Sequence, residues 1–163
     1  MGTRSITIFK DANRDEPEIG VLYRQHDGYP SGAGADILEC FKDHVAVNGI
    51  NADNQINGAG DMAVQLIAFL KTKQAKRFNY ETKEYEQRPV NAPGGFYLEP
   101  AGTRDCGEEY VYTLTFPKYS QTDFSWKGQI LLTVEDTYHD KVLYEGPLNE
   151  FDPQAAEKLK DED

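Results

Sequence analysis

The clearest pattern along the chain lies between residues 109 and 116, where Tyr, Leu and Phe alternate with Val and Thr. In "EYVYTLTF" every second residue is Tyr, Leu or Phe, which is the period of a β-strand with one buried face. Other short segments rich in β-branched and aromatic residues predict further strands. These are residues 5–9, 21–24, 95–99, 129–135 and 141–145.

Two segments have a helical period instead. Apolar residues recur every three to four positions from Asp36 to Val45, and an Asn-Gly pair then ends the pattern. A second helix is predicted over residues 62–74, where Asp61 is placed to cap it. The second helix is apolar over most of its circumference, which favours a deep position in the fold.

The remaining segments complete the predicted organisation. Residues 50–60 are rich in Asn and Gly and predict a loop, and residues 78–95 are predicted to be irregular and exposed. The order of elements predicts one α+β domain over residues 1–152, with residues 153–163 forming a short C-terminal helix and an acidic tail. We expect an antiparallel sheet with two main helices packed on one face.

The charge of the chain is large and uneven. The net charge is −11 for 163 residues, of which residues 1–81 contribute −2 and residues 82–163 contribute −9. A negative field of this size repels phosphate backbones, so we expect no direct nucleic-acid binding. The same field favours a protein partner with a basic surface.

The composition also bears on location and cofactors. The chain has no apolar run as long as a membrane span and no secretory signal at its start, so we expect a cytoplasmic protein without membrane contact. Its two cysteines, Cys40 and Cys106, are then free thiols. No Cys/His ligand spacing is present, and the Asn-rich segment 53–64 ends in Val64 where a calcium loop needs Glu. We therefore expect no metal and no cofactor.

One segment offers a candidate ligand site. "YRQHDGYPSGAG", residues 23–34, leads from a strand to a helix, where free backbone N–H groups can bind an anion. The segment lacks the Lys of a phosphate-binding loop and the third Gly of a dinucleotide fingerprint, so a plain turn is the competing interpretation. In the ligand-binding interpretation the site residues are Arg24, His26, Asp27, Gly32 and Gly34.

Each of the three histidines stands next to an aspartate in the sequence. Adjacent side chains on an extended chain point to opposite faces, so we predict no catalytic pair from these neighbours. A stronger signal comes from aromatic residues that lie near loops and acidic positions, a combination common at protein interfaces. The predicted partner-binding residues are Tyr29, Asp105, Glu108, Glu109, Tyr119 and Trp126.

The N-terminal motifs support a resemblance. "TRSITIF" followed by "LYRQHDGYPSGAG" resembles a group of small bacterial and phage proteins of unknown function. Those proteins begin with Thr-Arg-Ser and a strand, then carry an Asp-Gly-Tyr-Pro turn, a Gly and a helix. The matching positions are Thr3, Arg4, Ser5, Tyr23, Asp27, Gly28, Tyr29, Pro30 and Gly34. The group usually has His and then Trp before the Asp, where this chain has Gln25 and His26.

The resemblance implies a phage or mobile-element origin, and the charge implies a binding role. We expect stoichiometric binding to a host or defence protein, with a nucleic-acid-mimicking inhibitor as the sharpest form. One alternative is a binder of a small anionic ligand, or an enzyme, with its site at residues 24–36. Another is a structural virion or assembly component, which predicts a stable homo-oligomer. The sequence does not specify the oligomeric state or a catalytic activity.

Overall fold

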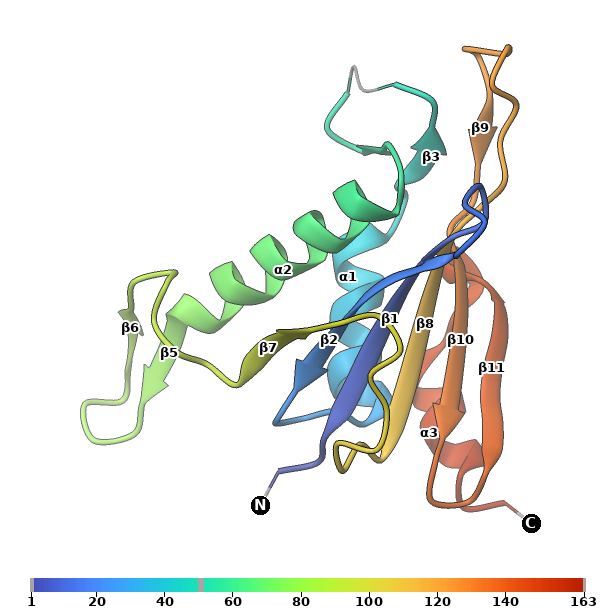
Figure 1. Cartoon of the computed structure of the whole chain (residues 1–163). Coiled ribbons are helices and arrows are strands. Elements are labelled where there is room, and N and C mark those ends of the chain that lie inside the picture. Colours follow the sequence, from blue (N-terminus) through green and yellow to red (C-terminus); the bar gives the residue numbers. More distant parts are fainter. Residues whose placement is uncertain (1, 50–51, 163) are drawn as a thin grey trace.

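A computed structural model describes residues 2–49 and 52–162 and confirms the α+β class (Figure 1). Its centre is a six-stranded sheet in the order β11-β10-β8-β1-β2-β7. In that order the strands are β11 (Lys141–Pro147), β10 (Leu131–Asp136), β8 (Tyr110–Phe116), β1 (Ser5–Asp11), β2 (Glu18–Arg24) and β7 (Phe96–Glu99).

The sheet is mixed, which corrects the prediction of a wholly antiparallel sheet. β1 pairs with β8 in parallel, with Ser5 opposite Tyr110, while the other neighbouring strands of this sheet are antiparallel. The two parallel strands are about a hundred residues apart in sequence. Alternation within one strand gives the face that each residue occupies, but not the direction of a partner so distant along the chain.

The main core lies between the sheet and two helices, α1 (Ala35–Phe41) and α2 (Ala59–Ala75). Figure 1 shows both helices on the same side of the sheet. The alternating side chains of β8, from Tyr112 to Phe116, are buried here as expected. α2 contributes Met62, Leu66 and Leu70, which are spaced one helical turn apart.

The opposite face of the sheet has a smaller core. Ile6, Ile8, Val21 and Val111 are buried there, beneath the connection of residues 100–109 that runs across β2, β1 and β8 (Figure 1). Glu108 stabilises this connection, because its carboxylate accepts hydrogen bonds from the backbone N–H groups of Asp105 and Cys106 at 3.0 and 2.8 Å.

The first predicted helix is too long. α1 ends at Phe41, and Asp43 adopts a left-handed conformation with φ of 64°, which stops a right-handed helix. The following residues form β3 (Val45–Val47), which pairs with β4 (Gln55–Ile56) and β9 (Lys127–Gly128). Val45 continued the apolar period past Phe41, but it is the first residue of a strand in which Ala46 and Val47 are buried.

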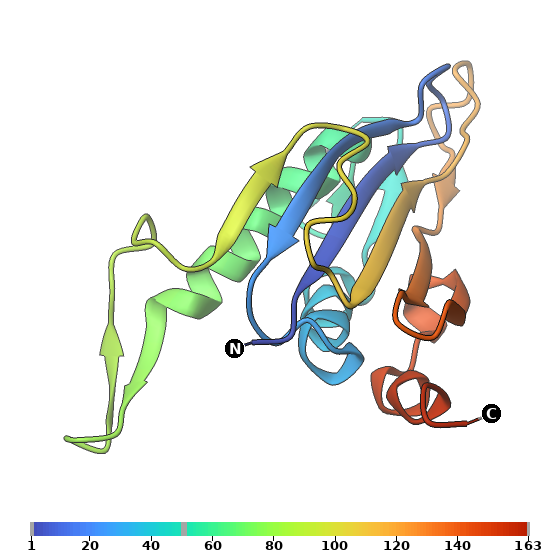
Figure 2. The ribbon, with the colours of Figure 1, turned by 60° about the horizontal axis from the view of Figure 1, so that its bottom comes forward.

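The prediction of an irregular segment at 78–95 is also wrong in part. A hairpin of β5 (Lys76–Asn79) and β6 (Glu84–Gln87) projects from the end of α2 (Figures 1 and 2). α2 itself begins at Ala59, and Asp61 lies inside its first turn rather than at the cap. The Asp61 carboxylate accepts hydrogen bonds from the Asn57 backbone and the Gln65 side chain.

Short helical segments complete the described chain. They are the π-helix η1 (Pro30–Gly34), the 3₁₀ segment η2 (Leu148–Glu150) and α3 (Pro153–Leu159). α3 begins as expected, because the Asp152 carboxylate accepts hydrogen bonds from the backbone N–H groups of Gln154 and Ala155. In the predicted loop 50–60 and acidic tail, residues 50, 51 and 163 lie outside the described residues. Among the helices described, none is long and apolar enough to span a membrane.

Candidate functional site

A cavity of about 660 Å³ lies at the end of the sheet where β8 begins and β10 ends. We call it the acidic groove. Its lining includes three tyrosines, Tyr29, Tyr110 and Tyr138. It also includes four carboxylates, which belong to Glu109, Asp136, Glu157 and Asp161. The volume falls within the range of small-molecule sites in proteins, so it can receive one or two large side chains.

Asp136 anchors one wall of the groove. The residue is buried, and its Oδ1 accepts hydrogen bonds from the backbone N–H groups of Tyr138 at 2.9 Å and His139 at 3.2 Å. Burial alone raises the pKa of the Asp136 carboxyl, but hydrogen bonds from the side chain and backbone of His139 outweigh that effect and lower it. The turn after β10 therefore holds an ionised carboxylate at the base of the groove.

His139 is oriented by the same carboxylate. Its Nδ1 lies 2.6 Å from Oδ2 of Asp136, and a carboxylate oxygen only accepts, so Nδ1–H donates. The ring also meets Tyr138 edge to face, with the ring centroids 5.0 Å apart. Thr137 fixes this turn to the start of β8 through hydrogen bonds from its hydroxyl to the carbonyls of Glu108 and Glu109.

α3 and η1 form the other wall. The Ser31 hydroxyl donates to the Glu157 carboxylate, whose two oxygens both lie 2.9 Å away. One turn further along, the Lys160 ammonium lies 6.0 Å from the centre of the Tyr110 ring, in a cation–π arrangement. The adjacent Tyr110 hydroxyl raises the pKa of Lys160. The groove therefore already holds one cation of the chain itself against an aromatic ring.

A second cavity, of about 470 Å³, lies beside the groove and is lined by four of the five predicted ligand-binding residues. Arg24, His26, Asp27 and Gly32 line it, and Tyr29 and Ser31 line both cavities. Gly34 is not among its lining residues. Gly34 is buried, and a Cβ there would lie about 3.1 Å from the Phe151 ring.

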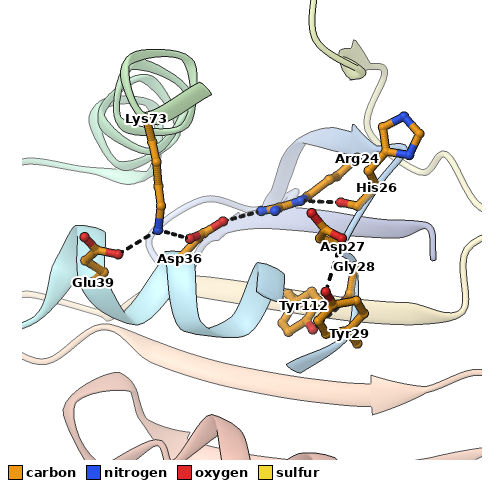
Figure 3. A network of polar contacts seen from close by, with 9 residues as sticks. All are labelled: Arg24, His26, Asp27, Gly28, Tyr29, Asp36, Glu39, Lys73 and Tyr112. Carbon is orange, nitrogen blue, oxygen red and sulfur yellow. Dashed lines mark hydrogen bonds and ion pairs between the residues drawn. The ribbon is translucent and has the colours of Figure 1, made fainter. Parts of the chain in front are cut away.

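Three charges of this second cavity, Arg24, Asp36 and Lys73, are paired with one another. The Asp36 carboxylate receives Arg24 at 2.7 Å and Lys73 at 2.6 Å, and Lys73 also reaches Glu39 at 2.9 Å. The hydrogen bond to Asp36 raises the pKa of Lys73. Figure 3 shows this chain of contacts joining β2, α1 and α2, with the His26 ring directed away from it.

The backbone of the glycine-rich segment is also engaged. The N–H group of Ser31 faces the Glu157 carboxylate at 3.3 Å, and those of Gly32 and Ala33 donate to the carbonyls of Tyr29 and Asp27. Gly28 allows a close approach to β1, since a Cβ there would lie 2.8 Å from the Arg4 backbone. These contacts give the segment a structural role, and its use as an anion site stays a prediction.

The predicted partner-binding residues fall into three separate places. Tyr29 and Glu109 line the acidic groove. Asp105 and Glu108 belong to the connection over the opposite face of the sheet, where Glu108 is partly buried. Tyr119 and Trp126 pack against Phe116 at the far end of β8, with ring centroids 6.2 Å from it in both cases. Partner binding at these six residues stays a prediction, and the structure brings only the first two together.

Sequence reasoning predicted only Tyr29 and Glu109 of the groove as binding residues and missed the others, among them Asp136, Tyr138, His139, Glu157 and Lys160. In the sequence His139 stands next to Asp140, but its partner in the structure is Asp136, three residues earlier. The signal was the Asp-x-x-His spacing between two predicted strands, because an Asp at the start of a turn often binds the backbone two and three residues later. Glu157 and Lys160 gave no such local signal.

The two thiols are poor nucleophiles at neutral pH. Burial raises the pKa of Cys40 to about 12 and, together with the Glu108 carboxylate, raises that of Cys106 to about 11. Since the thiolate is the reactive form, these side chains do not support a cysteine-based reaction. Among the described residues, no cluster of three or more His, Cys, Asp or Glu side chains is arranged to hold a metal ion.

Comparison with known proteins adds no assignment. No protein-family model, no curated protein and no solved structure matches this chain.

Proposed function

We propose that this chain is a binding protein whose acidic groove receives a cationic segment of a partner protein. One observation carries the proposal: three tyrosines and four carboxylates surround a single cavity in which Lys160 already lies over the Tyr110 ring. A Lys or Arg side chain from a partner would find the same two kinds of contact, an aromatic face and a carboxylate.

The charge of the whole chain acts in the same direction. A net charge of −11 attracts a basic surface over a distance of several ångströms and raises the rate of encounter. In the lining of the groove, Tyr138 supplies an aromatic anchor that is 85% exposed and can be buried at an interface. The arrangement combines long-range attraction with a defined contact point.

The partner proposed is a host or defence protein with a basic surface. This proposal draws on the resemblance of residues 3–34 to phage and bacterial proteins, and on the acidic charge. If the basic surface of the partner ordinarily binds nucleic acid, the carboxylates of the groove take the place of phosphates, and the chain inhibits by mimicry. Direct binding of nucleic acid is disfavoured by the same charge.

A pair of charge variants tests the groove. Glu109→Lys with Asp161→Lys reverses two exposed groove charges. Asp15→Lys with Glu16→Lys makes the same change of net charge in the exposed turn between β1 and β2, at the opposite end of the sheet (Figure 1). Binding of an Arg- and Lys-rich peptide is measured by calorimetry, and a pull-down from host lysate at low and high salt identifies the natural partner.

We expect the groove variant to lose about tenfold or more in peptide affinity, and the control variant to lose much less. The natural partner should likewise be retained by the control variant, released by the groove variant and released at high salt. Equal losses in the two variants would show that only net charge matters and would contradict a defined binding site. A natural partner that stays bound to both variants at high salt would also contradict binding at the acidic groove.

A further inference from the structure

The hairpin of residues 76–88, which we call the arm, has an exposed aromatic cluster. β5 and β6 form a two-stranded sheet of their own and project from the end of α2 away from the body (Figures 1 and 2). Phe78 meets Tyr80 and Tyr85 edge to face, with ring centroids 5.0 and 5.2 Å apart. Tyr80 is 85% exposed and Tyr85 is 67% exposed.

The arm has two different faces. Phe78 pairs with Tyr85 across the hairpin, and alternation places Lys76 on the same side as these two rings. Tyr80 lies in the turn after β5, and its ring contacts Phe78. The Lys76 ammonium lies 5.5 Å from the centre of the Tyr85 ring. An isolated two-stranded hairpin is marginally stable in water, and stable antiparallel sheets cover one face. The aromatic face of the arm therefore offers apolar area that a second surface would bury.

The charge of this region is opposite to that of the rest of the chain. Residues 71–88, which are the end of α2 and the arm, contain six Lys or Arg and three Glu, a net charge of +3. The remaining residues contain 11 Lys or Arg and 25 Asp or Glu, a net charge of −14. The arm thus has an aromatic face with a lysine, and it continues from a positively charged end of α2. The aromatic face is complementary to the tyrosines of the acidic groove, and the positive charge is complementary to its carboxylates.

We propose that the aromatic face of the arm docks in the acidic groove of a second copy of this chain. The proposal rests on the proposed function of the groove and names one occupant for it. Lys76 of one copy would take the kind of position that Lys160 holds over Tyr110. Figure 1 shows the arm and α3 at opposite sides of the molecule, so an arm does not reach the groove of its own chain.

The contact joins two different surfaces, the arm of one copy and the groove of another. Two copies can exchange arms reciprocally in a closed dimer, or the contact can continue from copy to copy into a ring or an open chain. Self-association then competes with a basic partner for the groove. Added salt weakens both interactions because both rest on opposite charges.

The test measures self-association by sedimentation velocity for the full chain at low and high salt. The arm variant is Lys76→Glu with Tyr80→Ser. Its matched control is Lys118→Glu with Phe124→Ser, which removes one exposed lysine and one exposed aromatic ring from the loop beside β9. The groove variant is again Glu109→Lys with Asp161→Lys. Each variant is also titrated with the Arg- and Lys-rich peptide used for the proposed function.

We expect the original chain and the control to associate at low salt, and the arm and groove variants each to do so about tenfold or more weakly. An equal mixture of the arm and groove variants has one intact arm–groove contact per pair, so it should form dimers and nothing larger. A groove variant that associates as strongly as the original chain would overturn the proposal, since the contact would then be arm to arm.

The two proposals fail in different ways. If the original chain binds the peptide through its groove but stays monomeric at low salt, the arm proposal is wrong and the proposed function stands. If the chain associates but the groove variant binds the peptide unchanged, the proposed function fails. In that case the mixture of variants still decides whether the arm enters the groove. The arm variant, whose arm no longer competes for the groove, should bind the peptide at least as tightly as the original chain.

Discussion

Asp36 has the least exposed side chain among the ion-paired residues of the network in Figure 3. The residue is 8% exposed, and it joins Arg24 of β2 to Lys73 of α2. The Arg24 side chain is itself only 13% exposed and also lies 5.6 Å from the centre of the Phe96 ring. Removal of the carboxylate would leave a partly buried guanidinium without its charged partner, a costly state in a medium of low dielectric constant.

Replacement of Asp36 by Asn should therefore lower the free energy of unfolding by about 2–3 kcal/mol. Glu39→Gln is the matched control, because Glu39 contacts the same Lys73 but is 60% exposed, where an ion pair contributes less than about 0.5 kcal/mol. Urea unfolding measures the free energy of unfolding of both variants. An unchanged m-value would show that the surface exposed on unfolding is the same as in the original chain. Equal and small effects would show that the network adds little to the fold.

Among the elements, the central strand β8 is packed in the hydrophobic core, whereas the arm lies outside it. Phe116 of β8 is fully buried, whereas Phe78 of the arm contacts Tyr80 and Tyr85 and lies outside both hydrophobic clusters of the described chain. Local stability follows the number of buried apolar contacts, so the arm should open independently of the body. An element that opens this way can be ordered by a partner.

Phe78→Ala should thus change the free energy of global unfolding by less than about 1 kcal/mol, while Phe116→Ala should lower it by about 3–5 kcal/mol. Hydrogen exchange provides the second measurement. In the Phe78 variant, amides of residues 76–88 should exchange faster and those of β8 should be unchanged. A large loss of global stability from Phe78→Ala would mean that the arm is part of the cooperative unit.

The elements that could be predicted from sequence are those whose burial follows a local period. β8 alternates because one face contacts the helices, and α2 shows its buried stripe every turn. The arm was missed because no residue of β5 or β6 is fully buried, so no period of burial is required of them. The parallel pairing of β1 with β8 depends on chain segments about a hundred residues apart, which no local pattern records.

The same limit applies to the groove. Tyr29 and Glu109 were predicted as partner-binding residues from their aromatic and acidic character, but the groove also needs α3 and the turn after β10. Those segments come together only because β8, β10 and β11 are neighbours in the sheet and α3 then folds back towards η1. Lys141 fixes this return, since its ammonium donates to the carbonyls of Leu159 and Glu162 at the end of α3.

At the scale of the whole molecule, the net negative charge destabilises the folded chain but favours binding to a basic partner. A net charge of −11 makes the folded chain repel itself, and that repulsion is relieved when salt screens it. The same screening weakens the attraction between the acidic groove and any basic partner. Folding stability and association should therefore respond to salt in opposite directions.

This expectation is measured in one salt titration. The melting temperature of the dilute chain should rise by about 2–5 °C between low and moderate sodium chloride, while association of a concentrated sample falls. The Asp36 network opposes the rise, because its ion pairs are also screened, but Asp36 and Arg24 are largely shielded from solvent and respond less than the exposed carboxylates. A melting temperature that falls with salt would show that ion pairs outweigh repulsion. Association that strengthens with salt would show that apolar burial, and not charge, drives it.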